Sequence, residues 1–270
     1  MKILAIMGSP KGKGSGYRVV QLIEKRMKAM GAVEFEYLFL KDANLQPCKG
    51  CYACIPKGED RCPLKDDRST IEAAILASDG IILSSPVYVL NVSWLMKNFI
   101  DRFASTNHRP HFHHQKVLLV ANSGGIGFKE TLAAMRHALG GMRVVHELGL
   151  GTAPWPVTEK AAAKNERAVQ KAAEKLYVAC LDKTLPGPGL YDYVGFLVQQ
   201  RIGTECKEWL PADYEFYKGR AYYYDTPVSP VIKAAAGVIL RFVFFIMRDM
   251  GPGNVKWPPR EEQATPEGKV

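Results

Sequence analysis

The stretch that most constrains the fold of this chain is residues 2–17, KILAIMGSPKGKGSGY. An apolar run, Ile3–Met7, is short enough to be a buried strand. Four glycines, two serines and two lysines follow within residues 8–16, and an amphipathic helix comes next. In this order of elements, backbone N–H groups and a helix N-terminus can hold a phosphate. The loop has neither the ending of a P-loop nor a dinucleotide fingerprint, so alone it indicates an anion site or an ordinary glycine-rich turn.

The composition is that of an ordinary globular protein, because 47% of the 270 residues are hydrophobic and 23% are charged. This length predicts one large domain or one domain with an extension. The net charge of +9 is spread along the chain without a basic cluster interleaved with aromatic residues, so we expect no nucleic-acid partner. No signal peptide is expected, and the crowded cysteines suit a cytoplasmic protein.

Strands and helices alternate up to about residue 150. The expected strands are Ile3–Met7, Val33–Leu40, Gly80–Ser85, Lys116–Asn122 and Arg143–Leu150. The expected helices are Gly16–Met30, Arg68–Ala77, Val92–Ala104 and Lys129–Leu139. The core-facing residues expected in the first helix are Val19, Val20, Leu22, Ile23 and Met27. The alternation predicts an α/β fold, with a doubly wound five-stranded parallel sheet that is covered by helices on both faces.

In such a sheet the ligand lies at the carboxyl ends of the strands, so the loops after the first, third and fourth strands form the candidate site. A wide, flat cofactor with an anionic tail would use all three loops. The candidates for holding its phosphate are Ser9, Lys11, Gly14, Ser15 and Gly16. The candidates for holding its ring are Pro86, Val87, Tyr88, Val89, Ser123, Gly124 and Gly125. Ser93 is the expected N-cap of the helix that follows the third-strand loop.

These motifs support a family resemblance over about residues 1–150. Gly8–Ser15, Ser85–Tyr88, Leu95–Arg102 and Ser123–Gly125 resemble elements of the NADPH-dependent FMN reductase family of flavodoxin-like proteins. The resemblance implies a flavodoxin-like fold, bound FMN, a homo-oligomer and reduction of FMN by NAD(P)H. Lys11 stands where the family usually has Arg, and Ser15-Gly16 where it has Asn-Thr. The phosphate would therefore depend more on backbone amides and serine hydroxyls.

Four cysteines between the second and third strands form a C-x2-C-x2-C-x7-C run, made of Cys48, Cys51, Cys54 and Cys62. Four thiolates at this spacing can hold one [4Fe–4S] cluster, and the run resembles that of the iron–sulfur flavoproteins. A zinc ion and metal-free thiols that cover the flavin are the alternatives. We favour metal-free thiols over a cluster, and a cluster over zinc.

Two polar segments near this run are given structural roles. Asp66 and Asp67 are expected to cap the helix that begins near Arg68. A histidine tract precedes the fourth strand and comprises His108, His111, His113 and His114. Such a tract could bind a transition metal or border the nicotinamide or acceptor site. We favour an exposed connection, because the tract has no acidic partner nearby in the sequence.

The pattern changes after residue 150. Lys160–Leu181 is predicted to be a long helix, and Pro186–Gly189 is predicted to be a linker. We therefore expect an FMN-binding domain over residues 1–183 and a mainly helical C-terminal extension over residues 184–270. A tyrosine-rich patch is expected to pack against the body or a partner subunit, and it comprises Tyr214, Tyr217, Tyr222, Tyr223 and Tyr224.

Residues 231–250 are apolar except for a narrow cationic stripe. On a helix, Lys233, Arg241 and Arg248 fall within an arc of about 80°. Burial in a dimer or against the body is the favoured placement of this helix. Peripheral contact with an anionic membrane surface comes second, and a membrane span comes third.

Together these features predict an FMN-dependent oxidoreductase. It would take a hydride from NAD(P)H onto flavin and pass electrons to a small acceptor, namely a quinone, a flavin, a nitro or azo compound or an iron centre. No side chain is expected to act as a catalytic acid or base. The alternative is a non-enzymatic flavodoxin-like or iron–sulfur electron carrier that docks a redox partner protein. A membrane-associated redox sensor is a third possibility.

Overall fold

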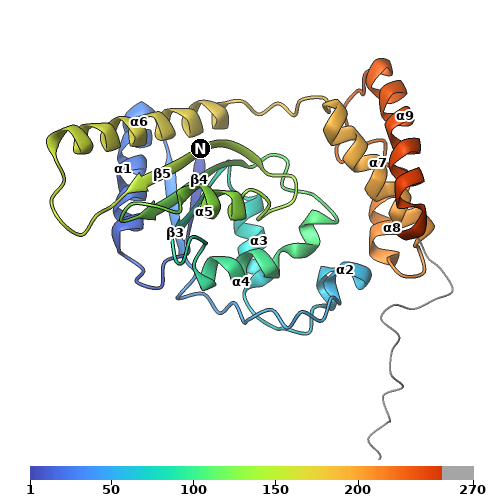
Figure 1. Ribbon diagram of the computed structural model, residues 1–270, viewed down its shortest axis with the longest axis horizontal. Helices are drawn as coiled ribbons and strands as arrows, with labels where there is room; N and C mark the ends of the chain where they lie inside the picture. The colour runs from blue at the N-terminus through green and yellow to red at the C-terminus, as the bar shows by residue number, and fades with distance from the viewer. Residues whose placement is uncertain (251–270) are drawn as a thin grey trace, which may run out of the picture.

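The computed structural model describes residues 1–250, and its central element is a five-stranded parallel sheet (Figure 1). The strands are β1 (Lys2–Met7), β2 (Glu34–Phe39), β3 (Gly80–Pro86), β4 (Lys116–Ser123) and β5 (Arg143–Gly151). Their order across the sheet is β2-β1-β3-β4-β5. This order confirms the predicted flavodoxin-like fold and places the topological switch point between β1 and β3.

Helices cover both faces of the sheet. One face carries α1 (Ser15–Met30) and α6 (Glu159–Leu181), and the other carries α3 (Arg68–Leu76), α4 (Trp94–Arg102) and α5 (Phe128–Met135). Short helical turns occur at α2 (Cys54–Lys57), η1 (Glu59–Arg61) and η2 (Ala104–Asn107). The expected bounds agree with these to within two residues, except that α5 ends at Met135 instead of Leu139.

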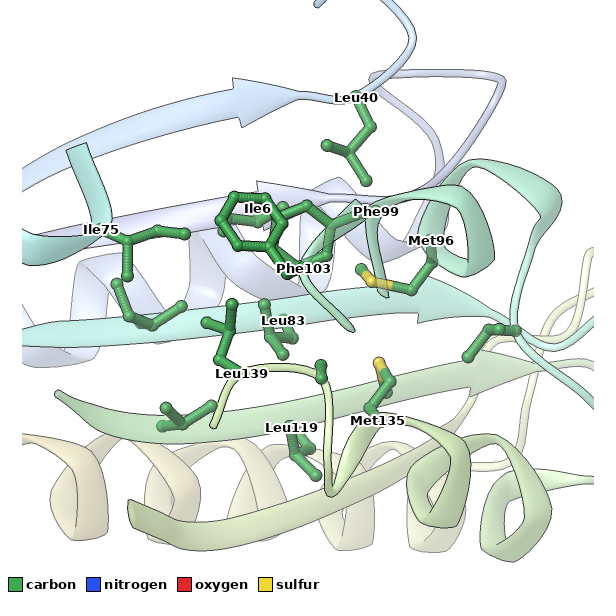
Figure 2. Packing of buried hydrophobic residues seen from close by; sticks show 14 of the residues in the cluster. Ile6, Leu40, Ile75, Leu83, Met96, Phe99, Phe103, Leu119, Met135 and Leu139 are labelled. Carbon is green, nitrogen blue, oxygen red and sulfur yellow. The ribbon is translucent and has the colours of Figure 1, made fainter. Parts of the chain in front are cut away.

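Along the central strands the side chains alternate between the two faces of the sheet, and they fill one hydrophobic layer on each face. Ile3 and Met7 of β1 pack toward α1 and α6, whereas Ile6 packs toward Phe99 and Phe103 on the opposite face (Figure 2). All these side chains are fully buried, as expected for a parallel sheet that is covered on both faces. One residue predicted to face the core does not do so. Leu22 is 52% exposed, because it lies on the flank of α1 that faces solvent.

A C-terminal module, defined here as residues 190–250, follows a connection without regular secondary structure. It consists of α7 (Leu190–Glu205), α8 (Pro211–Tyr217), α9 (Pro230–Ile246) and η3 (Met247–Met250). The module lies at one end of the body, with α8 beside α2 (Figure 1). The tyrosine-rich patch packs as predicted, since Tyr217 and Tyr222 are buried and the Tyr223 ring stacks 5.1 Å from His113. Residues 251–270 of the predicted extension lie outside the described residues.

Candidate functional site

The loops after β1, β3 and β4 meet at the carboxyl edge of the sheet. The Gly8 amide donates to the Ser84 carbonyl oxygen over 2.8 Å, and the Ser93 hydroxyl donates to the Gly8 carbonyl oxygen. The Val87 amide donates to the Asn122 carbonyl oxygen over 2.9 Å. These bonds join the three loops into one surface. The structure therefore brings together the three groups of residues that the sequence predicts for a cofactor site.

The first loop leaves the N-terminus of α1 open. Its N-cap residue, Gly14, makes no side-chain cap hydrogen bond, and the first turn contains no acidic residue. The first backbone N–H groups of a helix have no partner within the helix, so those of α1 can face an anion. Lys11 and Lys13 are exposed beside this end. This arrangement suits a phosphate that is held mainly by backbone amides.

Gly16 has a packing role that its sequence position did not reveal. A Cβ atom at this residue would lie 2.6 Å from Oδ1 of Asn122 and 3.4 Å from Oγ of Ser84. The absence of a side chain lets the first turn of α1 lie directly on the ends of β3 and β4. Gly16 departs from the family pattern, and the close contact between helix and strands at this position explains why a residue without a side chain fits here.

The loop after β3 contains a strained turn. Tyr88 and Asn91 exchange both backbone hydrogen bonds, at 2.8 and 3.0 Å. Between them, Val89 and Leu90 have φ values of 49° and 59°, a left-handed conformation that is costly for residues with a Cβ atom. Val89 is 99% exposed, so the turn projects its apolar tip into solvent, and Leu90 of the same turn lies against Gly127 of the loop after β4. Strained turns of this kind cluster at binding sites.

The loop after β4 combines a close contact with open backbone. A Cβ atom at Gly127 would lie 2.5 Å from Cγ1 of Val87, and this glycine has a φ of +87°. At Gly124 and Gly125 a Cβ atom would meet nothing within 4 Å. The Ser123 hydroxyl accepts from the Gly125 amide over 3.0 Å and shapes this open part of the loop. A flat ring could therefore approach the backbone of the loop closely.

The four cysteines of the C-x2-C-x2-C-x7-C run border one small cavity, which Arg68 and Arg102 also line. Two of the thiols are exposed and two are partly buried. Burial raises the pKa of the Cys54 thiol, and the neighbouring cysteines raise it further. Among residues 1–250, no three His, Cys, Asp or Glu side chains are placed to hold a metal ion. The thiols share a cavity without converging on one centre.

Two buried arginines stand behind the cysteine cavity. The Arg102 guanidinium pairs with both carboxylate oxygens of Asp66, and its Nη2 lies 3.8 Å from Sγ of Cys62. The Arg68 guanidinium donates to the Arg102 carbonyl oxygen over 2.9 Å and to Glu72 over 2.8 Å, while its Nη2 is buried without a partner. Asp66 and Glu72 thus offset the charges of the two guanidinium groups.

The prediction that both aspartates cap α3 is only partly correct. Asp67 occupies the N-cap position but makes no side-chain cap bond to α3; it accepts from the Asn44 amide over 2.9 Å instead. Asp66 binds Arg102, and one of its oxygens accepts from the Arg68 amide over 3.2 Å. Burial would raise the pKa of Asp66, but the hydrogen bonds from Arg102 and from backbone amides hold it below its ordinary value.

The histidine tract lies before β4, at the opposite end of the sheet from the three loops. Only His114 of the four histidines is exposed, so the expectation of an exposed connection is wrong for the other three. His111 bonds to Glu72 over 2.8 Å, and His108 bonds to Asp213 of α8 over 2.9 Å. The C-terminal module covers this tract, because α8 and the tyrosines pack against it. The tract therefore does not border the carboxyl edge.

Ser93 confirms its prediction and does more than cap a helix. Its hydroxyl accepts from the Met96 amide over 3.2 Å, which caps α4, and it also bonds to Gly8 of the first loop. Sequence reasoning missed Asn122 and Leu90 as parts of the site. Nothing in the local sequence marks a left-handed Leu, and the role of Asn122 depends on Gly16 lying against it.

Comparisons with known proteins agree with this fold. A family model described as NADPH-dependent FMN reductase matches residues 1–153. An iron–sulfur flavoprotein of Archaeoglobus fulgidus is 30% identical over 229 residues, which are 82% of this chain and 100% of that protein. One from Methanocaldococcus jannaschii is 38% identical over 104 residues, 38% of this chain and about half (51%) of that protein.

The fold is also similar to that of a solved flavone reductase. The TM-score is 0.52 at 19% identity, and the match covers 69% of this chain and 66% of the other. At this identity the likeness concerns the fold alone.

Proposed function

The chain belongs to the NADPH-dependent FMN reductase family, and on that premise we propose that the joined loops at the carboxyl edge of its sheet hold the flavin. The family makes it an NAD(P)H-dependent FMN oxidoreductase. When bound, FMN supplies the redox chemistry, taking electrons from NAD(P)H and releasing them to an acceptor. The observation that carries the proposal is the junction of the three loops beside the open N-terminus of α1.

The phosphate of FMN would lie on the first loop. The first-turn amides of α1 would donate to it, together with the hydroxyls of Ser9 and Ser15, and Lys11 would add a positive charge. The backbone at Gly14 and Gly16 would let the phosphate approach closely. Gly16 would act indirectly, by keeping the helix terminus against Asn122.

The flavin ring would lie between the other two loops. Pro86, Val87, Tyr88 and Val89 would border one side, and Ser123, Gly124 and Gly125 the other. The open backbone at the two glycines would place amides near the ring and so stabilise negative charge on it. The exposed tip of the strained turn would exclude water from one edge of the ring.

The test of the site compares FMN affinities. We expect Lys11→Ala with Ser9→Ala to weaken FMN binding about hundredfold, because a charge-assisted and a neutral hydrogen bond are lost. Lys25→Ala, an exposed cation farther along α1, is the matched control and should not change the affinity. Unchanged binding in the loop variant would remove the phosphate assignment.

Reduction by NAD(P)H separates the enzyme from a pure electron carrier. Anaerobic mixing of the flavin-loaded protein with NADPH or NADH should bleach the flavin absorption band. The acceptor would be a small molecule that replaces the nicotinamide over the ring, and a quinone, a flavin, a nitro or azo compound and an iron centre are the classes to assay. Failure to bleach with either nucleotide would favour the electron carrier.

The sequence favours metal-free thiols in the cysteine run, but the names of the relatives support the second choice, and we propose that Cys48, Cys51, Cys54 and Cys62 hold a [4Fe–4S] cluster. The four thiols fit a cluster in number and type and line one cavity, although they do not converge on one centre, and relatives are named iron–sulfur flavoproteins. A cluster would allow the two electrons of the flavin to leave singly.

Metal analysis of anaerobically purified protein tests the cluster. Iron and acid-labile sulfide should be present in equal amounts and should be lost in Cys54→Ser. Cys206→Ser, which alters a partly buried thiol in the C-terminal module, should retain both. Zinc without sulfide would show that the cysteines form a zinc site, and no metal at all would show that the thiols are metal-free. Neither result would affect the flavin assignment.

For organisation, we propose a flavin-binding domain over residues 1–183, an extension over residues 184–270, a homo-oligomeric state and a cytoplasmic location. Peripheral membrane contact would come from residues 231–250. The separate aromatic core of the C-terminal module supports the division of the chain. Light scattering after size exclusion tests the oligomeric state.

A further inference from the structure

Helix α9 is apolar but is not a core helix. The segment Pro230–Asp249 has a mean hydropathy of 2.0, the level of a membrane-crossing helix, yet only 6% of it is buried. Within α9 the single fully buried residue is Ala236. The helix packs on α7 and lies on the outer side of the C-terminal module (Figure 1). Ala236 and Ile232 pack in the core of the C-terminal module, but the outward-facing apolar residues of α9 do not contribute to it.

The exposed apolar residues share one face. At 100° per residue they span an arc of about 100° on the side of α9 away from α7. This face, called the α9 outer face below, comprises Val231, Val238, Phe242, Phe245 and Ile246, which are 61–75% exposed. Contiguous apolar surface of this kind marks a site of contact with a protein or a membrane.

Cations border the α9 outer face along one flank. Arg241 and Arg248 are exposed and lie beside it, and the Arg248 guanidinium sits 4.9 Å from the centre of the Phe245 ring. Residues 230–248 contain no acidic residue; the nearest is Asp249, 3.8 Å from Arg248. An apolar face with cations at its edge is the pattern of helices that lie in an anionic membrane interface.

We propose that α9 docks this protein on the surface of an anionic lipid bilayer, with the helix lying in the plane of the interface. Phe242 and Phe245 would enter the boundary between headgroups and acyl chains, and Arg241 and Arg248 would bind lipid phosphates. The proposal concerns a surface remote from the proposed flavin site and does not depend on it.

The packing of α9 argues against a membrane span. Its inner face contacts α7, which carries Gln200, Arg201 and Glu205, and the Arg201 guanidinium covers the Phe244 ring at 4.0 Å. If α9 crossed the bilayer, it would lose these contacts or carry charged groups of α7 into the hydrocarbon, where burying a charge is costly. An in-plane position keeps α7 on the aqueous side and leaves the module folded.

The charges on α9 argue against a homodimer in which the α9 outer faces of two copies pack together. If two α9 outer faces met, each would bring Arg241 and Arg248 without an acidic residue in residues 230–248 to oppose them. Lipid phosphates supply that missing negative charge. The described charges therefore fit an anionic bilayer better than a homodimer built on α9.

Vesicle co-sedimentation of the full chain tests the proposal. The protein should bind vesicles of phosphatidylcholine mixed with phosphatidylglycerol and remain free of vesicles of phosphatidylcholine alone. Phe242→Asp with Phe245→Asp should abolish binding. Arg241→Gln with Arg248→Gln should weaken it about thirtyfold, at roughly 1 kcal/mol for each cation.

Matched controls use exposed residues of α6. Lys164→Gln with Lys171→Gln removes the same charge from the body, and Val178→Asp with Leu181→Asp alters two apolar residues that are 64% and 60% exposed. Both should bind anionic vesicles as the wild type does. Thermal melting must show that every variant is folded.

Three results would overturn the proposal. Wild-type protein that stays in solution with anionic vesicles would exclude the membrane, and equal binding to neutral vesicles would exclude recognition of lipid charge. A folded Phe242→Asp, Phe245→Asp variant that still binds anionic vesicles, but has lost an oligomer that the wild type forms, would make the α9 outer face a protein interface.

Discussion

The sheet body and the C-terminal module place similar apolar sequences in opposite environments. In β1, Ile3, Ala5 and Met7 are fully buried on one face, and Leu4 and Ile6 are fully buried on the other. In α9, which is comparably apolar, Ala236 is the one residue that is fully buried. A strand in a covered parallel sheet has neighbours on both faces, whereas α9 has α7 on one side only. Burial thus depends on how many elements surround a segment, and hydrophobicity alone does not decide it.

The two regions also differ in how they are held together. The body rests on strand pairing and aliphatic packing, but a polar network joins the module to it. The buried Arg109 guanidinium pairs with Asp213 of α8 and donates to the Ile55 carbonyl oxygen over 2.8 Å. The Tyr217 hydroxyl donates to the His108 carbonyl oxygen over 2.6 Å. Because Arg109 also bonds to the Cys54 carbonyl oxygen, the module and the cysteine run share one anchor.

The largest effect should come from breaking this anchor. Asp213→Ala removes one carboxylate partner of the buried Arg109 guanidinium, which keeps Glu59 at 3.0 Å, and should cost about 3 kcal/mol of stability. We expect lower resistance to chemical unfolding and faster proteolysis within residues 182–189. Glu205→Ala removes the partner of Arg201 in an exposed pair and serves as the control, with a loss below about 0.5 kcal/mol. Equal stability of the two variants would mean that the network does not hold the module.

The next effect concerns the body and its ligand edge. Gly16→Val forces a side chain against Asn122 and should weaken FMN binding about hundredfold, because the first turn of α1 must move away from β4. Fluorescence titration with FMN measures it. Gly195→Ala in α7 of the C-terminal module is the control, since its Cβ atom would meet nothing within 4 Å. Comparable affinities in both variants would show that this contact does not position the phosphate site.

Acid should loosen the module before the body. Burial lowers the pKa of His113 from 6.5 to about 4, so the folded protein favours its neutral form. The unfolded chain binds more protons below pH 6.5, so this stabilisation is complete above 6.5 and is lost toward 4. The loss should reach about 3 kcal/mol. His113→Phe, which keeps an aromatic ring beside Tyr223, should flatten this dependence in denaturant titrations across that pH range.

Another histidine works in the opposite direction. Burial would lower the pKa of His111, but Glu72 and the Arg109 carbonyl oxygen raise it overall. The contribution of His111 to stability is therefore present below the ordinary histidine pKa and is lost as the pH rises through the raised value.

The His113 prediction has a clear contrary outcome. If His113→Phe left the acid dependence of stability unchanged, the stacking of the tyrosines on His113 would not be the pH-sensitive contact.

The smallest effect should come from the exposed tether between the two regions. Lys183 pairs with Asp79 at 2.7 Å beside the connection that leads to the module, and its side chain is 64% exposed. Lys183→Ala should cost about 0.5 kcal/mol or less, since solvent screens exposed ion pairs. Thermal melts of this variant beside Asp213→Ala would rank the tether against the anchor. A larger loss for Lys183→Ala would reverse the comparison.

The sequence predicted the fold and the position of the candidate site because both depend on local patterns. Alternating strands and helices imply a parallel sheet, and the glycine-rich segments at the ends of β1 and β4 mark the ligand edge. The partners that meet there were not predictable. Asp66 was expected to cap a helix, and besides accepting from the Arg68 amide it binds Arg102, a residue far away in the chain. The left-handed turn at Val89 and Leu90 contains no glycine from which it could have been predicted.

What the sequence determined by itself is the layered α/β body, since strand and helix periodicities are properties of neighbouring residues. It also determined the set of residues available for a phosphate, a ring and a cluster. Only the tertiary structure decided that Gly16 must lie against Asn122, that Asp213 anchors the module and that one face of α9 stays outside. Those outcomes depend on which distant segments meet and on the space left between them, and local periodicity contains no information about either.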